Sequence, residues 1–286
     1  MKRKPLKNHL DCVAAVVVHL PNEDGYHEHR LEVIKTSLLS MRMHAPDWLH
    51  IHIWDNGSCE VLRDWLRDEY KPDALTLTKN MGKTYAQAAL FRSYPEDQIM
   101  VYADDDMFYY PGWLEAQIRI YDTYPDSVVT GYPTRGACRW GTDNTIEQLR
   151  EIADKIETGF FMPDQWLEDY SASVGAKQVS ANIAKTQQTR VIYNGVAAYA
   201  TSHHCQMLFR AGDLLQFTEY AGKATRNEKG YDIAIDKAGL LRLATKKRYT
   251  RHIGNILDGD LLEDAYKLGV LPPAPYYYEV IAGTHV

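Results

Sequence analysis

Short apolar segments alternate with amphipathic segments through the first half of this 286-residue chain. Segments typical of buried strands occur at 14–19, 49–54, 74–78, 98–102 and 127–132. Segments whose apolar residues recur at helical spacing lie between them, at 28–43, 60–69, 84–92 and 113–121. Strands separated by helices of this length are joined by crossovers, which favour parallel pairing. The alternation therefore predicts an α/β fold with a mostly parallel central sheet flanked by helices.

Composition and charge exclude several classes of protein. Hydrophobic residues make up 45% of the chain, which is too many for a disordered protein. The 18 glycines show no period, so collagen-like and repeat architectures are excluded. A net charge of −6 argues against a uniformly basic nucleic-acid-binding surface but permits a local basic groove. Tyr outnumbers Phe by 20 to 6, and side chains with one polar end suit a polar binding cleft.

Two features bear on the cellular compartment. Basic residues precede the apolar run at 12–20, as in a signal peptide, but that run is short and has no small-residue cleavage site. No segment approaches the roughly 20 apolar residues that a membrane-spanning helix needs. The four cysteines are scattered and form no CxxC pair, which is typical of free thiols in a reducing compartment. We therefore expect a cytoplasmic location and no transmembrane segment.

The segment 138–190 interrupts the alternation. It is polar and poor in strand signal, and Gly159, Pro163 and Gly175 divide it, so we expect a helical insertion or lid over the sheet. Strand patterns return at 191–200 and 206–210, and a helix is expected to begin near Tyr231. These changes predict one domain over 1–260, with halves at 1–133 and 191–260 on either side of the insertion. A C-terminal tail follows at 261–286, with a small helix and a proline-rich turn.

Aspartates follow two of the expected strands. Asp55 comes after the segment 49–54, and Asp104, Asp105 and Asp106 come after the segment 98–102. In an open parallel sheet, ligands bind beyond the carboxyl ends of the strands. Three consecutive carboxylates repel one another, and a hard cation such as Mg²⁺ or Mn²⁺ relieves that repulsion through oxygen ligands. The sequence therefore predicts a divalent metal site here, with an acidic surface turn as the alternative.

The order and spacing of three motifs resemble the nucleotide-sugar glycosyltransferases of the GT-A (Rossmann-like) fold, particularly the large inverting family 2. The motifs are Asp55-Asn56-Gly57-Ser58, Asn80-Met81-Gly82-Lys83 and Asp104-Asp105-Asp106. The resemblance covers about 12–133 and resumes over 191–255. It implies a nucleotide-sugar-binding half at 1–133, and an acceptor half with the catalytic base at 191–260.

The resemblance also assigns roles to residues of the first half. It implies that Asp55 contacts the nucleobase, usually uracil. It places Asn80, Gly82 and Lys83 along the nucleotide, near the base or the phosphates.

For the acidic triplet, the resemblance implies that Asp104 faces the ribose or the metal and that Asp105 belongs to the nucleotide-sugar site. Asp106 would ligate the metal that bridges the diphosphate, and His252 would be a further ligand. A lone histidine is also a common structural hydrogen-bonding group, which is the alternative for His252.

The same resemblance requires a general base that deprotonates the acceptor. The usual Glu-Asp pair is not intact, and Asp232 at an expected helix start is the nearest match, with Asp236 as the alternative. An Asp in the first turn of a helix is also a normal stabilising choice. His203 and His204 lack the spacing of a zinc site and are candidates to line the acceptor cleft.

Further features of the insertion and of the second half have two interpretations each. The basic residues at 246–248, together with Arg251, would either hold a diphosphate or an anionic acceptor or form a solvated turn. Trp140 and Trp166 would either stack on a sugar or anchor the insertion.

These observations predict an enzyme: an inverting glycosyltransferase that requires Mn²⁺ or Mg²⁺. Its donor would be a nucleoside diphosphate sugar, with UDP as the expected nucleotide. Its acceptor would offer a free hydroxyl on a glycan, a lipid-linked sugar, a protein or a modified nucleobase. One alternative is a sugar-phosphate nucleotidyltransferase, although 20–25 lacks the Gly-rich signature of that class. The other is a noncatalytic binding module on the same fold. The sequence carries no signal for an oligomeric state.

Overall fold

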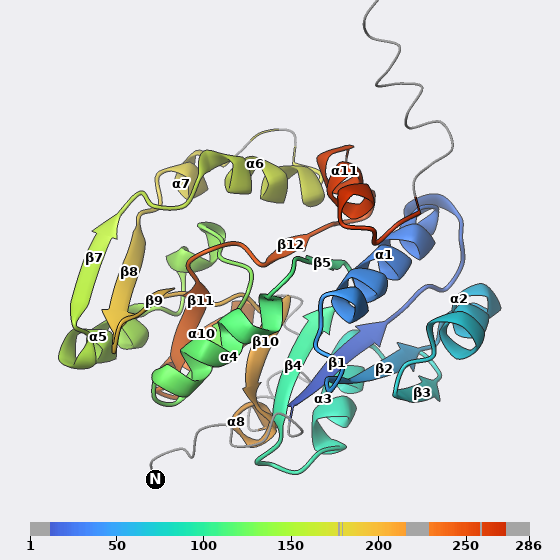
Figure 1. Ribbon diagram of the computed structural model, residues 1–286, viewed down its shortest axis with the longest axis horizontal. Coiled ribbons are helices and arrows are strands. Elements are labelled where there is room, and N and C mark those ends of the chain that lie inside the picture. Colours follow the sequence, from blue (N-terminus) through green and yellow to red (C-terminus); the bar gives the residue numbers. More distant parts are fainter. Residues whose placement is uncertain (1–11, 177, 179, 216–228, 258, 273–286) are drawn as a thin grey trace, which may run out of the picture.

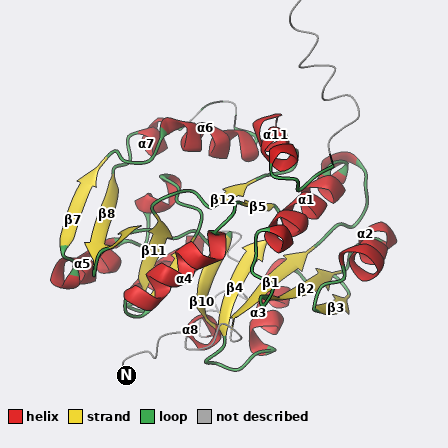
Figure 2. Cartoon of the chain, viewed as in Figure 1, coloured by secondary structure: helices red, strands yellow, loops and turns green. Residues whose placement is uncertain are grey.

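The computed structural model describes residues 12–176, 178, 180–215, 229–257 and 259–272 (Figure 1). A ten-stranded sheet runs through the molecule in the order β3-β2-β1-β4-β10-β6-β11-β9-β8-β7, with helices on both faces (Figure 2). Its strands are β1 (Cys12–Val18), β2 (His50–Asn56), β3 (Ala74–Thr78), β4 (Ile99–Asp104), β6 (Ser127–Thr130), β7 (Lys155–Gly159), β8 (Gln188–Tyr193), β9 (Val196–Tyr199), β10 (Gln206–Arg210) and β11 (Leu241–Thr245). A separate two-stranded sheet joins β5 (Met107–Tyr109) to β12 (Thr250–His252).

The helices follow the strands much as the alternation predicts. In the first half they are α1 (Arg30–Met43), α2 (Glu60–Asp64), α3 (Lys83–Arg92) and α4 (Trp113–Thr123), and α2 continues as a π-helical turn (Trp65–Tyr70). Later helices are α5 (Asp143–Ile152), α6 (Asp164–Ser173), α7 (Ala181–Ala184), α8 (Ala211–Leu215), α10 (Lys229–Lys237) and α11 (Gly259–Lys267). Short 3₁₀ turns occupy Gly25–His27 and Gly136–Arg139. None of the helices described here is long and apolar enough to span a membrane.

Apolar side chains on both faces of β1 explain why it is wholly buried. Ala14, Val16 and Val18 point into a core shared with α1 and α4. Ala15 and Val17 point into a second core shared with α3, α8 and α10. Successive side chains of a strand alternate between faces, so an unbroken apolar run requires cover on both. This burial fixes the register of β1 and hence the positions of the loops at its end.

The α/β fold class, with a central sheet flanked by helices, is confirmed. Pairing is parallel from β3 through β4 and again between β6 and β11, while β10, β9, β8 and β7 join antiparallel. All four cysteines are free, as predicted. The division into 1–260 and a tail stays a prediction, and α11 packs against Val33 and Phe108 through Leu261 and Ala265.

Two local expectations differ from the structure. The segment 191–200, expected as one strand, is a hairpin of β8 and β9 that turns at Asn194 and Gly195, both with positive φ. The insertion contains helices α5, α6 and α7 as expected, but also strand β7, which pairs with β8 and extends the sheet. The sequence also predicts a Gly- and Lys-rich loop at 222–230, and most of it lies outside the described residues, as does most of the proline-rich turn of the tail.

Candidate active site

Strands β1, β2 and β4 end at one edge of the sheet. Val18 of β1 pairs with Asp55 of β2, and Val17 pairs with Asp104 of β4. Adjacent strands are about 4.8 Å apart, so the two aspartates flank β1 at about 10 Å from each other. The register therefore brings the two acidic clusters to one edge of the sheet, as the sequence predicts.

Asp55 is buried, and both of its carboxylate oxygens form hydrogen bonds within the fold. One oxygen accepts the Ser58 N–H at 3.0 Å, and the other accepts Arg63 Nε at 2.7 Å. Its side chain is 0% exposed. Arg63 also donates to the Thr78 carbonyl at 2.9 Å, which ties the end of β2 to the end of β3. Contact between Asp55 and a nucleobase stays a prediction, and it would require Arg63 to move.

The loop at 80–82 packs directly on the turn after β2. Gly57 has φ +84°, and a Cβ there would lie 2.4 Å from the Asn80 nitrogen, so only glycine allows this approach. The Asn56 side chain accepts the Met81 N–H at 3.0 Å, and Asn80 Oδ1 accepts the Gly82 N–H at 2.9 Å. The structure thus brings the two predicted nucleotide motifs together, with Asn80 and Gly82 exposed.

Lys83 begins α3 and forms an ion pair with Asp104, Nζ to Oδ1 at 2.9 Å. Tyr102, two residues earlier on the same face of β4, donates its hydroxyl to that oxygen at 2.9 Å, and Gln87 donates to the Tyr102 hydroxyl. Burial alone would raise the pKa of Asp104, but Lys83, His204 and Tyr102 together lower it below its usual value. Asp104 is therefore an anion beside a lysine and a helix N-terminus.

Asp105 points to the other side of β4, toward α1. Its carboxylate forms an ion pair with Arg30 and accepts the His19 N–H at 3.2 Å. Burial and the neighbouring carboxylates of Asp104 and Asp106 raise its pKa, although Arg30 opposes them. The three consecutive aspartates therefore have different partners: Asp104 pairs with Lys83, whereas Asp105 and Asp106 share the guanidinium of Arg30. Any contact of Asp105 with a nucleotide sugar stays a prediction.

Asp106 meets His252 from the small sheet. One Asp106 oxygen accepts Arg30 Nη1 at 3.1 Å. The other, Oδ1, is buried, has no hydrogen-bond partner among the described residues, and lies 3.6 Å from His252 Nε2. His252 Nδ1 is held by Ser173 Oγ at 2.8 Å, which turns Nε2 toward Asp106. A cavity of about 710 Å³ opens beside these residues.

This donor set fits a divalent cation. A buried carboxylate oxygen without a partner lies next to an imidazole nitrogen, and Mn²⁺ accepts both oxygen and nitrogen ligands. The hydrogen bond from the second ring nitrogen to Ser173 is the usual way to orient a ligating histidine. The structure thus brings Asp106 and His252 together as predicted, and ligation itself stays a prediction.

Asp232 lies in the first turn of α10 and is 0% exposed. Arg242, also 0% exposed, approaches Asp232 Oδ1 at 2.9 Å. His204 Nδ1 lies 2.8 Å from Oδ2, and Trp140 Nε1 donates to the same oxygen at 3.4 Å. Burial would raise the pKa of Asp232, but Arg242 and His204 lower it below its usual value. The residue predicted as the base is therefore a buried anion, and its neighbour His204 is 14% exposed.

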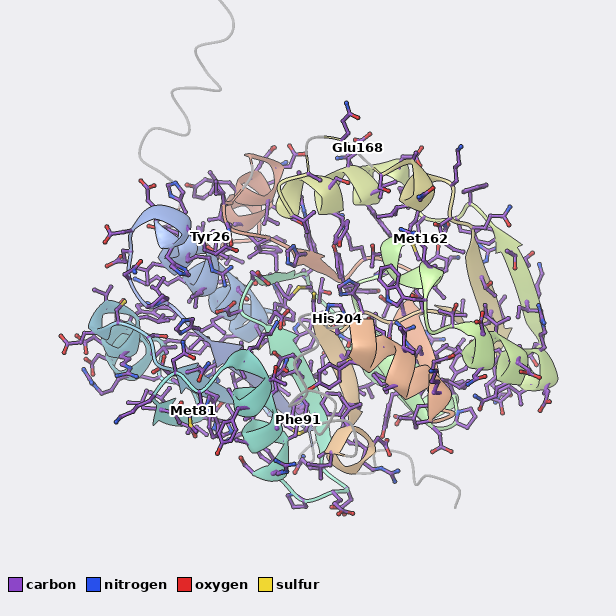
Figure 3. The ribbon with its side chains drawn as sticks, turned by 180° about the vertical axis from the view of Figure 1, so that it is seen from behind. Tyr26, Met81, Phe91, Met162, Glu168 and His204 are labelled. Carbon is purple, nitrogen blue, oxygen red and sulfur yellow. The ribbon has the colours of Figure 1, made fainter. Side chains whose placement is uncertain are left out.

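Figure 3 shows His204 near the middle of the molecule, beside β10 and α10. His203, His204 and Cys205 form the group of metal-ligating type found among the described residues. His204 Nδ1 is taken by Asp232, and His203 Nδ1 accepts the Cys205 N–H at 3.3 Å, while the two rings stack at 4.3 Å. The Nδ1 atoms of both rings are therefore engaged within the fold, which argues against this group as a zinc site.

Asp236, the alternative base, holds α5 in place. Its Oδ1 accepts the backbone N–H and the hydroxyl of Thr145, at 2.9 and 2.7 Å, and its Oδ2 accepts the Asn144 N–H at 3.2 Å. These are the first amides of α5, which have no partner inside the helix. Asp236 therefore anchors α5 to α10.

Three contributors were not expected from the sequence. None of them belongs to a sequence motif. Each contacts a site residue far away in the chain: Arg30 contacts Asp106, Arg242 contacts Asp232 and Ser173 contacts His252. A signal existed only for Arg242, because a cation inside an otherwise apolar strand requires a buried anion.

Comparison with known proteins places these residues in a family. The model of the family described as "Glycosyl transferase family 2" matches residues 16–176, more than half of the chain. No curated protein matches the chain. A crystal structure of GalNAc-T7 with UDP, GalNAc and Mn²⁺ is similar at a TM-score of 0.50 and 10% identity, over 86% of this chain and 44% of that one. The galactosyltransferase LgtC, in complex with donor and acceptor sugar analogues, has a TM-score of 0.41 at 11% identity, over 80% and 72%. The chain thus spans less than half the length of the GalNAc-T7 chain, and the likeness concerns the fold.

Proposed function

The chain belongs to glycosyl transferase family 2, and from this premise we propose that it transfers a sugar from a nucleoside diphosphate to an acceptor hydroxyl. The expected nucleotide is UDP, the expected cation is Mn²⁺ or Mg²⁺, and the expected course is inversion. The observation that supports this most is the ion pair between Lys83, at the start of α3, and Asp104, at the end of β4. Next to it, Asp106 Oδ1 and His252 Nε2 face each other at 3.6 Å. A cytoplasmic location stays a prediction from the free thiols.

The donor's nucleotide would lie along the edge formed by His19, Asn80, Gly82 and Lys83. His19 Nε2 and Asn80 Nδ2 are 3.3 Å apart, and the loop they border ends at the N-terminus of α3. Free backbone N–H groups and the helix dipole favour a phosphate at such a terminus. Lys83 is 43% exposed and can turn from Asp104 to a diphosphate without being desolvated.

Asp104, Asp106 and His252 are the residues that would hold the cation. When bound, the cation would neutralise the charge that grows on the departing nucleoside diphosphate. Arg30 and Lys83 already balance two of the carboxylates and keep this edge from excess negative charge. The hydrogen bond between His252 Nδ1 and Ser173 of α6 orients Nε2 toward Asp106, so α6 would be part of the site.

We assign the proton transfer to the Asp232–His204 pair. Because Asp232 is fully buried, direct contact with an acceptor would require the fold to open, whereas His204 is partly exposed. Asp232 would fix the orientation and tautomer of the ring, and His204 Nε2 would accept the proton of the attacking hydroxyl. A single base of this kind fits a single displacement, hence inversion.

Nucleoside diphosphate release without an acceptor tests the proposal. A thermal-shift screen over nucleotide sugars with and without Mn²⁺ selects the donor, and slow Mn²⁺-dependent hydrolysis of that donor is expected. Asp106→Ala should lower this rate at least about 10²-fold, the scale of removing one charge-stabilising group. Asp64→Ala, an exposed carboxylate outside the site, is the matched control. Full activity of Asp106→Ala in Mn²⁺ would refute the metal assignment, and a retained anomer in the product would refute inversion.

A further inference from the structure

A second cavity, of about 690 Å³, lies where the end of β7, the start of α6 and the loop between β11 and β12 meet. Its lining residues are all different from those of the cavity beside Asp106 and His252. The volume is within the range of ordinary small-molecule pockets. Figure 1 shows α6 above this region, reaching from the paired strands β7 and β8 toward α11. The insertion supplies half of its lining residues, whereas the donor-binding half supplies only Tyr110.

Aromatic rings form one side of the cavity. Phe160 and Phe161 follow β7, and Trp166 comes from the first turns of α6. Phe160 is 58% exposed although it is a large apolar side chain. An open aromatic wall of this kind suits a ligand with an apolar face, such as the C–H face of a sugar ring.

Two guanidinium groups on the wall are held in place by ion pairs with carboxylates. Arg190 pairs with Glu157 at 2.6 Å and lies over the ring of Phe161 at 4.4 Å. Arg248 pairs with Asp169 and lies over the ring of Trp166 at 5.5 Å. These contacts hold the aromatic rings in place, so the wall is organised before any ligand arrives.

Two lysines add positive charge that no ion pair among the described residues neutralises. Lys246 and Lys247 line the cavity, are exposed, and form no ion pair with any residue in the described ranges. No acidic side chain lines the cavity within those ranges either. An anionic group of a ligand would therefore meet two free ammonium groups at the mouth of an aromatic pocket.

Helix α6 connects this cavity to the proposed active site. Trp166 faces the cavity, Asp169 binds both Arg248 and Arg251, and Ser173 holds His252. Seven residues of helix separate Trp166 from Ser173, which corresponds to about 10 Å at 1.5 Å per residue. The cavity is thus close enough for one extended ligand to occupy it and still reach the donor.

From these contacts we infer that the cavity binds an acidic sugar of the acceptor glycan, a ring that carries a carboxylate or a phosphate. The inference rests on the proposed transferase function for its role as an acceptor site. Single-stranded nucleic acid combines stacking and charge as well, but it needs a basic groove that follows several phosphates. This cavity offers two free cations in a chain of net charge −6, which favours a ligand with one anionic group.

Binding is measured by calorimetry on the full chain, without donor or metal, so that the result does not depend on catalysis. The probes are methyl β-glucuronide and glucose 6-phosphate, with methyl β-glucoside as the neutral match and a short oligo-dT as the nucleic-acid arm. The double variant Lys246→Gln/Lys247→Gln removes the free charge from exposed positions. Lys185→Gln/Lys267→Gln removes two exposed lysines elsewhere and is the matched control.

The acidic sugars should bind about tenfold more tightly than the neutral sugar, since a charge-assisted contact supplies that much. The Lys246/Lys247 variant should lose this advantage, while the control variant keeps it. Whichever of carboxylate and phosphate binds more tightly identifies the anion. Equal binding of the neutral sugar, unchanged binding by the Lys246/Lys247 variant, tighter binding of oligo-dT or no binding of any probe each overturns the inference. Absent donor hydrolysis in the unmodified chain would instead overturn the proposed function.

Discussion

The two halves of the sheet hold their functional groups in different ways. From β3 to β4 every pairing is parallel, and the functional side chains lie where strands end, as Asp55 and Asp104 do. From β10 to β7 most pairings are antiparallel, and the groups come from a turn, a helix start and an insertion, as His204, Asp232 and Ser173 do. In the first half, topology alone brings the groups together. In the second half, specific buried partners must do so.

This difference has an energetic consequence. Asp232 depends on Arg242 inside the core, and Asp236 depends on the first amides of α5. A change in such a network removes stability and chemistry together, because a buried charge is left without its partner. A change at an exposed helix start, such as Lys83 of α3, should affect ligand binding more than folding.

The largest expected effect is on catalysis in the second half. His204→Gln should lower kcat for transfer by about 10²–10⁴-fold, since it removes the group that accepts the proton. The KM for the donor should change far less than kcat, because His204 is expected to act on the acceptor hydroxyl and not on the donor. Steady-state kinetics measures both constants.

Asp232→Asn separates positioning from direct catalysis. It should lower kcat as His204→Gln does, and the double variant should cost no more than either single change, because the two residues act as one unit. Full additivity of the two losses would show that Asp232 works independently of His204. His203→Gln, which changes the neighbouring ring, is the control for local disturbance.

The next effect concerns stability. Arg242→Met should lower the free energy of unfolding by about 3–5 kcal/mol, since it leaves Asp232 buried without its cation. Arg67→Met, which breaks an ion pair with Asp64 in which both side chains are more than half exposed, should cost less than about 1 kcal/mol. Urea unfolding of both variants measures the difference. Equal losses would mean that the buried ion pair contributes no more to the free energy of unfolding than an exposed one.

The sequence predicted the first half of the fold well because two regular signals agree there. Apolar runs identify β1, β2 and β4, and helical spacing identifies α1 and α4. Strand β7 was missed because its residues, Lys155–Gly159, lack apolar character, and its pairing with β8 is what makes it a strand. The β8–β9 turn was missed because Asn194-Gly195 lies inside an otherwise continuous apolar pattern.

The candidate site was predictable to the same extent. Strand ends pointed to Asp55 and Asp104, and the tertiary fold then gave Asp55 a buried partner in Arg63. The pairing of Asp232 with His204 joins residues 28 positions apart, and no local pattern reveals a contact of that kind. Long-range side-chain contacts of this type are set by packing, which sequence periodicity does not encode.

Gly254 and Gly239 both have positive φ and differ in the space around them, so they test the backbone contact between α6 and the loop after β12. Gly254 has φ +82°, and a Cβ there would lie 2.0 Å from the Ser173 carbonyl, so Gly254→Ala must push α6 away from the loop after β12. We expect a loss of about 1–3 kcal/mol in stability and a weaker Mn²⁺-induced thermal shift. Gly239→Ala has a similar φ with open space around it and isolates the backbone cost. If Gly254→Ala is no worse than Gly239→Ala, the contact between α6 and this loop does not matter.

The smallest effect is a pH dependence that again distinguishes the halves. Burial, followed by the charge of His204, holds the pKa of His203 well below its usual value, so the folded protein keeps this ring neutral. The unfolded chain binds a proton near pH 6.5. Stability contributed by the neutral ring is therefore present above that pH and falls as the pH is lowered, by at most about 1.4 kcal/mol per unit. His52 of β2 also has a lowered pKa through burial, but its nitrogens are paired with Tyr94 and Thr76. The free energy of unfolding should be measured from pH 7.5 to 5.5. His203→Gln should reduce its dependence on pH more than His52→Gln does. The reverse order would show that His52, and not His203, has the more strongly lowered pKa.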